Sequence, residues 1–127
     1  LSELLEQADC GLLLDINNVY VNCINHGLDP YGFLDQLPLE RTVQIHMAGH
    51  KQSGDIVLDT HGSSIADPVY DLLKYALGRP GVKVHAISIE RDQNQPAFTE
   101  LKEELAAIKS IYKNATSGAL SVKKEGA

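Results

Sequence analysis

The sequence lacks several features that would restrict its class. It holds only two cysteines, Cys10 and Cys23, which lie far apart without a spacing pattern. They fit free thiols in a reducing cytoplasm better than a disulfide framework. No apolar run approaches the roughly 18 residues of a membrane-spanning helix, which argues against a membrane protein. The net charge of −6 argues against a nucleic-acid partner. What remains is a chain of 127 residues with ordinary apolar content, enough for about one domain.

Apolar strands alternate with helical segments along this chain, which predicts an α/β fold built from parallel βα units. We expect strands over residues 11–14, 43–47 and 82–89, and helices over 2–9, 19–25, 30–37, 68–77 and 96–112. The run 11–14 is apolar throughout and is expected to be buried on both faces. The run 56–58 is either an edge strand or an anchor for its loop. The pairs Asp29-Pro30 and Asp67-Pro68 each predict a helix cap followed by the first helical residue.

The two ends of the chain carry their own expectations. The opening Leu1–Glu6 has neither a basic start nor an initiator Met, so we expect no signal peptide and a chain entered partway through a helix. Residues 113–127 are small and polar and are expected to form a disordered tail. The expected organisation is therefore a metal-binding domain over residues 1–112 followed by a tail over 113–127.

Each predicted strand ends in a side chain that can bind a metal: Asp15, His46 and Glu90. Because the carboxyl ends of parallel strands lie on one side of a sheet, these three side chains can meet. A carboxylate at the end of a buried strand is costly unless it is paired, hydrogen-bonded or bound to a metal. Two other roles stay open. Asp15 could cap the next helix, and Glu90 could form a salt bridge with Lys83, whereas Arg91 would point to the opposite face.

More metal-binding side chains follow the second strand, in the segments His46-Met47-Ala48-Gly49-His50 and Asp59-Thr60-His61-Gly62. Asp59 and His61 face the same way if their backbone is extended. Oxygen and nitrogen donors without thiolate suit iron, zinc or manganese. The alternative is two solvent-facing loop histidines and an Asp in a turn. His26 is interpreted as a helix-end residue and His85 as a packed or edge histidine.

Four segments together resemble one family, the multinuclear non-haem iron-dependent oxidative enzymes, which are similar in turn to the xylose-isomerase-like barrels that include apurinic endonucleases. The resemblance covers Gly11 to Tyr112. The segments are Leu12–Val21, Gln44–His50, Asp59–Gly62 and Ile89–Asp92.

The resemblance implies a (β/α)₈ TIM-type barrel, of which this chain would be the C-terminal portion of about three βα units. It implies one metal ion held by Asp15, His46 and Glu90, and a second held by Asn18, Asp59 and His61. The endonuclease branch has a histidine in the place of Asn18, so this ligand is the least secure. His50 is implied as a catalytic residue that lines the site.

The resemblance also implies an activity. Members of the family oxidise cysteine or the backbone of small ribosomal peptides with dioxygen at two or three iron ions, often with a partner protein that presents the precursor. Zinc or manganese, with hydrolase or isomerase chemistry, is the alternative, as is a non-catalytic structural or binding remnant. Because a barrel takes ~250 residues, we expect this chain to be inactive alone and to self-associate through its exposed sheet edges.

Overall fold

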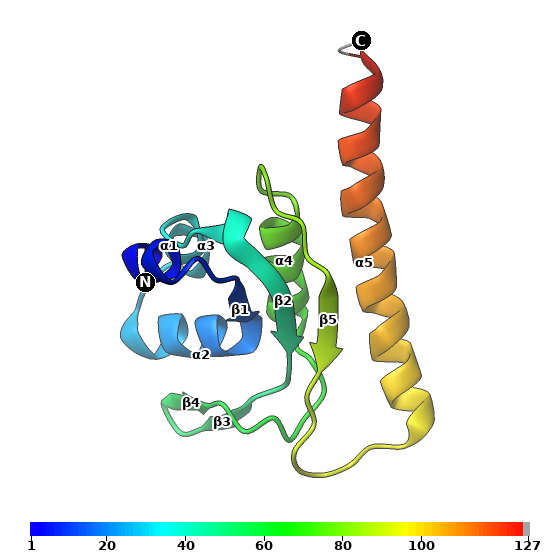
Figure 1. Cartoon of the computed structure of the whole chain (residues 1–127). Coiled ribbons are helices and arrows are strands. Elements are labelled where there is room, and N and C mark those ends of the chain that lie inside the picture. The colour runs from blue at the N-terminus through cyan, green and yellow to red at the C-terminus, as the bar shows by residue number, and fades with distance from the viewer. Residues whose placement is uncertain (126–127) are drawn as a thin grey trace.

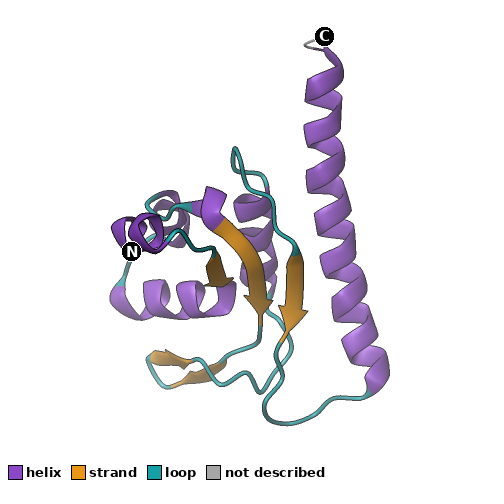
Figure 2. Cartoon of the chain, in the orientation of Figure 1, coloured by secondary structure: helices purple, strands orange, loops and turns teal. Residues whose placement is uncertain are grey.

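The computed structural model describes the backbone of residues 1–125 and the burial of side chains up to residue 117. Its secondary structure alternates helices and strands (Figures 1 and 2). The elements are α1 (Ser2–Ala8), β1 (Leu12–Asp15), α2 (Ile16–His26), α3 (Pro30–Asp35), the 3₁₀ helix η1 (Leu39–Arg41), β2 (Thr42–Met47), β3 (Lys51–Ser53), β4 (Ile56–Leu58), α4 (Asp67–Leu77), β5 (Ala86–Ile89) and α5 (Phe98–Glu125).

The central sheet has three parallel strands in the order β1-β2-β5, as the alternation of strands and helices predicts. Asp15 lies in register with His46, and His46 with Ser88, so these residues share one face of the sheet. The three strands point toward the same group of loops (Figure 2). The run 56–58 does form a strand, β4, but this strand is not an edge of the central sheet. It pairs with β3 in a separate antiparallel hairpin.

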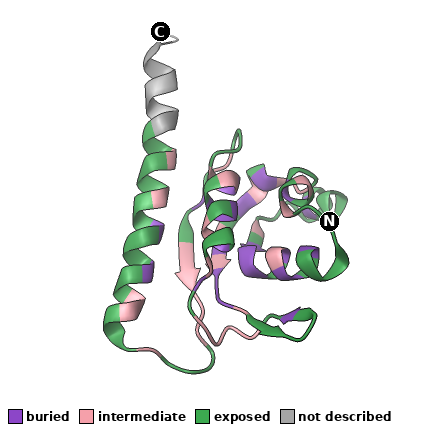
Figure 3. Ribbon diagram, turned by 180° about the vertical axis from the view of Figure 1, so that it is seen from behind, coloured by how far each residue is buried: buried purple, intermediate pink, exposed green. Residues whose placement is uncertain are grey.

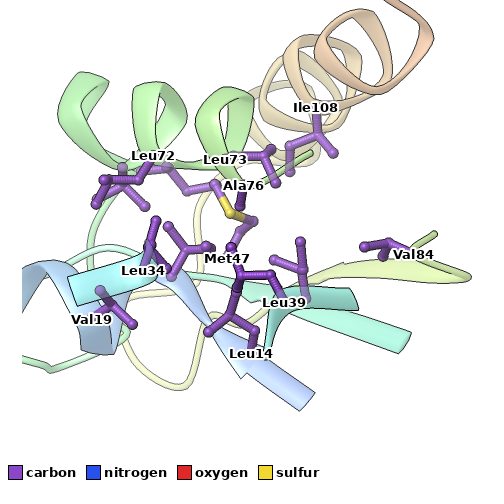
Figure 4. Packing of buried hydrophobic residues seen from close by; sticks show 14 of the residues in the cluster. Leu14, Val19, Leu34, Leu39, Met47, Leu72, Leu73, Ala76, Val84 and Ile108 are labelled. Carbon is purple, nitrogen blue, oxygen red and sulfur yellow. The ribbon is translucent and has the colours of Figure 1, made fainter. Parts of the chain in front are cut away.

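Helices α2, α3, α4 and α5 contribute to the core on the other face of the sheet (Figure 4). Ile45 and Met47 alternate with His46 on β2 and are fully buried, because they point toward the helices. They pack with Leu34 and Leu73 among others. Figure 3 shows that burial is concentrated between sheet and helices. This core fixes the face on which His46 lies, because a one-residue slip would exchange the two faces.

The second face of the sheet is open within the described residues, which corrects one expectation. Residues 11–14 are not buried on both faces: Leu14 is buried against the helices, but Leu13 on the opposite face is 49% exposed. The run of apolar residues cannot by itself show whether an element covers each face. The arrangement of parallel strands with helices over one face is compatible with part of a TIM-type barrel.

Several element boundaries differ from the expectations. The last strand begins at Ala86, where pairing with β2 starts at Gln44, and residues 82–85 precede it without strand structure. Asp29 caps α3 as predicted, whereas Ala66 stands at the cap of α4, so Asp67 is already helical.

The last helix does not end at Tyr112. It continues to Glu125, so the disordered tail is wrong for residues 113–125, and residues 126–127 lie outside the described part. Small residues in this part, such as Ala115, are compatible with a helix. The division into a domain over 1–112 and a following segment stays a prediction.

Two further observations concern the cysteines and the search for membrane-spanning helices. Cys23 is buried and Cys10 exposed, and both are free thiols. Within the residues that the structure describes, no helix is both long enough and apolar enough to cross a membrane.

Candidate metal centre

The carboxyl ends of β1, β2 and β5 bring Asp15, His46 and Glu90 together. Asp15 and His46 are in register on one face, and Glu90 follows two residues after Ser88 in the same row. One potential ligand atom from each of the three lies within 4.8 Å of the others. His46 Nδ1 is 2.9 Å from Glu90 Oε1. The pattern of strand ends therefore placed these three side chains correctly relative to one another.

A second group forms around His61, on the loop that follows β4. His61 Nδ1 is 3.1 Å from Glu90 Oε2 and 3.2 Å from Asp92 Oδ2, and these three residues also satisfy the 4.8 Å separation. Glu90 is thus shared by both groups, one oxygen toward His46 and the other toward His61. Asp92 is absent from the ligand set expected from the sequence. The sequence could have indicated Asp92, because it stands two residues after Glu90, and Asp59 and His61 are separated by the same spacing.

The other ring nitrogen of His61 faces Asp59 and Asp15. His61 Nε2 is 3.1 Å from Asp59 Oδ1 and 3.8 Å from Asp15 Oδ2. His61 has a φ of 49°, a left-handed conformation that is uncommon outside glycine and occurs at functional sites. Its backbone N–H donates to Gly49 O at 3.1 Å, which holds this conformation. The extended backbone assumed for Asp59-x-His61 is therefore wrong, although the two side chains do meet.

Asp15 caps the next helix, as one of the two alternatives predicts, and its second oxygen also faces the site. Its Oδ1 accepts a hydrogen bond from the Asn18 backbone N–H at 2.8 Å and so caps α2, while Oδ2 faces His61. Asn18 reaches the site indirectly, because its side-chain amide donates to Asp59 Oδ2 at 3.1 Å. Burial raises the pKa of Asp15, although the hydrogen bond from Asn18 opposes this shift.

Asn17, which sequence reasoning did not single out, connects His50 to the site. Asn17 is fully buried, and its amide nitrogen donates to Asp59 Oδ1 and to Gly49 O. Both partners only accept hydrogen bonds, so the amide orientation is fixed and Asn17 Oδ1 accepts from His50 Nδ1 at 2.9 Å. His50 therefore carries its proton on Nδ1, and its Nε2 has no hydrogen-bond partner among the described residues. Burial lowers the pKa of His50, and its ring stacks on Tyr20.

The charges at the site fit bound cations. Four carboxylates meet at the site, those of Asp15, Asp59, Glu90 and Asp92. Together they carry more negative charge than two imidazolium rings can neutralise. In the described part of the chain, these carboxylates form ion pairs with histidines alone. Neighbouring ligand atoms about 2.1 Å from one ion in octahedral geometry are about 3.0 Å apart. The distances of 2.9 and 3.1 Å from Glu90 to the two histidines fit this spacing. The donor set suits iron, zinc or manganese.

With the geometry in place, the chain can be compared with known proteins. Residues 1–113 match the family described as RiPP precursor modification enzyme MbnB/TglH/ChrH. The chain belongs to this family. The resemblance inferred from the four sequence segments is thereby confirmed at the level of the family, which modifies ribosomally made peptide precursors.

Curated relatives carry the name UPF0276 protein. One from Acinetobacter baylyi is 48% identical over 108 residues, which is 84% of this chain and 37% of the relative. One from Caulobacter vibrioides is 40% identical over 121 residues, 95% of this chain and 42% of the relative. One from Shewanella oneidensis is 45% identical over 118 residues, 92% and 42% of the two chains. The chain spans about two fifths of the length of the curated relatives it matches.

Proposed function

We propose that this chain provides one side of the metal centre of an oxidative enzyme that modifies a ribosomal peptide. The observation that carries this proposal is Glu90, whose two oxygens face histidines of two different groups of ligands. A carboxylate in this position can bridge two cations. Membership of a RiPP precursor modification family supports a peptide as substrate.

We propose the following roles for the residues of the site. Asp15, His46 and Glu90 would hold one ion, and His61 with Glu90, Asp59 and Asp92 would hold a second, with Asn18 acting through Asp59. When bound, iron would supply one-electron chemistry with dioxygen as the oxidant. The buried Asn17 amide keeps Asp59 and His50 in place. His50, with its Nε2 free, is the proposed catalytic residue because it can accept a proton or hydrogen bond from a substrate group.

The rest of the enzyme is also part of the proposal. We infer that the three βα units form part of an eight-stranded barrel whose other strands supply further ligands for two or three ions in all. The length of the relatives and the open inner face of the sheet support this inference. The cysteine or backbone of the peptide is the proposed point of oxidation, and a partner protein that presents the precursor is proposed with it.

Metal binding tests the proposal directly. Chain purified without metal should bind two divalent ions, measured by calorimetry with Mn²⁺ and, under anaerobic conditions, with Fe²⁺. Failure to bind either ion at neutral pH would refute the metal centre. Oxygen consumption by an iron-loaded full-length relative with a cysteine-containing peptide tests the chemistry. Peptide or sugar turnover with colourless zinc and no oxygen uptake would instead favour a hydrolase or isomerase.

A further inference from the structure

Arg91 stands between two acidic residues of the site but points away from them. Its side chain is 6% exposed and packs under α5, where Nη2 lies 3.2 Å from Glu104 Oε2 and 3.4 Å from Glu100 Oε1. The Glu104 side chain is 8% exposed. This is a buried ion pair between the loop that follows β5 and the second turn of α5. It belongs to none of the metal-ligand groups described above.

The same two glutamates also hold the loop that follows His61. Glu104 Oε1 accepts a hydrogen bond from the Ile65 backbone N–H at 2.7 Å, and Glu100 Oε1 accepts one from the Ser64 hydroxyl at 2.7 Å. One helix therefore anchors the loop of His61 and the loop of Glu90 and Asp92. The two loops are also joined directly, because the Asp92 backbone N–H donates to His61 O at 2.9 Å.

Stability alone is a weak explanation for this pair. A buried ion pair is often no more stabilising than apolar residues of the same volume, since both charges lose their hydration. Arg91 Nε is buried without a hydrogen-bond partner in the described structure, which adds to this cost. A geometric role explains the arrangement better. Glu104 accepts hydrogen bonds both from Arg91 and from the Ile65 backbone N–H.

We propose that Arg91 and Glu104 are positioning residues that set the distance between His61 and the carboxylates of Glu90 and Asp92. The inference rests on the proposed metal centre. It predicts that breaking the anchor weakens the ion shared by these three side chains while the sheet stays folded. The Asp15–His46 side of the centre lies on paired strands and should be affected less.

The test replaces the pair by apolar residues of similar size, Arg91→Met with Glu104→Met, so that no charge is left buried alone. Mn²⁺ calorimetry should show one of two sites weakened about 10–100-fold, the range typical of residues that support metal ligands. Amide hydrogen exchange on the metal-free protein should accelerate at His61 and Asp92. Exchange at Ile45 in β2 should remain as in the wild type.

Two further variants separate positioning from folding. Glu103→Gln changes an exposed glutamate on the same helix and should behave as the wild type in both measurements. Arg91→Lys keeps the charge, and its metal affinity and exchange rates should fall between the wild type and the double variant. If the double variant unfolds, Glu104→Gln, which keeps an acceptor for Ile65, takes its place with the same expectation at reduced size.

The measurements distinguish a failure of the positioning role from a failure of the proposed metal centre. Wild-type Mn²⁺ affinity and wild-type exchange at His61 and Asp92 in the double variant would overturn the positioning role. Absence of Mn²⁺ binding by the wild type would overturn the proposed metal centre instead. In that case the exchange rates of the metal-free protein still decide whether Arg91 and Glu104 hold the two loops together.

Discussion

The substitution Glu90→Gln tests the central feature of the site, the carboxylate shared by two groups of ligands. Glutamine keeps the shape of the side chain but offers one neutral oxygen in place of two charged ones. Both histidines that face Glu90 therefore lose a common partner. We expect Mn²⁺ affinity to fall by at least about 100-fold, the upper end of the effect of residues that only support ligands.

The expected effect on stability follows from linkage. At a free Mn²⁺ concentration of 100 times the wild-type Kd, binding at one of the two proposed sites stabilises the folded state by about 2.7 kcal/mol, and a 100-fold weaker Kd leaves about 0.4 kcal/mol. For a chain of this length, 1 kcal/mol corresponds to about 3–5 °C in Tm. The variant should thus lose about 7–12 °C of the thermal shift that Mn²⁺ gives the wild type.

Without metal the same substitution should have little effect, because two contributions oppose each other. Glu90 lies within 4.8 Å of the ligand atoms of Asp15 and Asp92, and removing its charge relieves up to about 3.5 kcal/mol of repulsion per pair at an effective dielectric constant of 20. Partial exposure reduces this figure, since the side chain is 34% exposed. The lost ion pairs with the two histidines cost about 0.2–1 kcal/mol each at this partly exposed position. The net change should stay near 1 kcal/mol.

Differential scanning fluorimetry with and without Mn²⁺ measures both quantities on one preparation. Glu103→Gln, the same chemical change at an exposed position of α5, is the matched control and should keep the full thermal shift. A full shift in Glu90→Gln, or an equal loss of Tm with and without metal, would refute the shared role of this carboxylate.

Three further predictions concern the loop, the half-buried His50 and the sheet edges. Gly49→Ala should cost about 3 kcal/mol or more in urea unfolding, because its Cβ would lie 2.0 Å from Ser63 O, whereas Gly62→Ala meets nothing closer than 3.4 Å and should be tolerated. Burial lowers the pKa of His50, so the folded state loses stability as the pH falls below 6.5, the ordinary pKa of a histidine. His50→Gln should make the free energy of unfolding depend less on pH in this range. An unchanged slope between pH 7 and 5 would contradict this expectation. The edges of β1 and β5 are unpaired in the described sheet, so light scattering should show concentration-dependent self-association, and a monomer at every concentration would argue against it.

The sequence alone predicted the parts that follow from local periodicity. The parallel order of the strands predicted that Asp15, His46 and Glu90 meet at the same edge of the sheet, as they do. The cap at Asp29 could be read in the same way, because it depends on residues two and three positions away.

The conformation of the loops could not be predicted in this way, because contacts between residues far apart in the sequence determine it. His61 adopts a left-handed backbone held by Gly49, and Asn17 donates a hydrogen bond to Asp59, which is 42 positions away. The length of α5 was missed as well, since little is buried between Ile111 and residue 117, where the described side chains end, and helical periodicity is weak there.

The sequence by itself therefore determined which chemical groups stand at the ends of the strands and that these ends lie at one edge of the sheet. The tertiary structure decided that Glu90 lies between His46 and His61, that Asp92 joins them, and that Arg91 turns to Glu104. The physical reason is that strand geometry repeats every two residues and can be read locally. Loop geometry is fixed by packing and hydrogen bonds between segments that only the folded chain brings together.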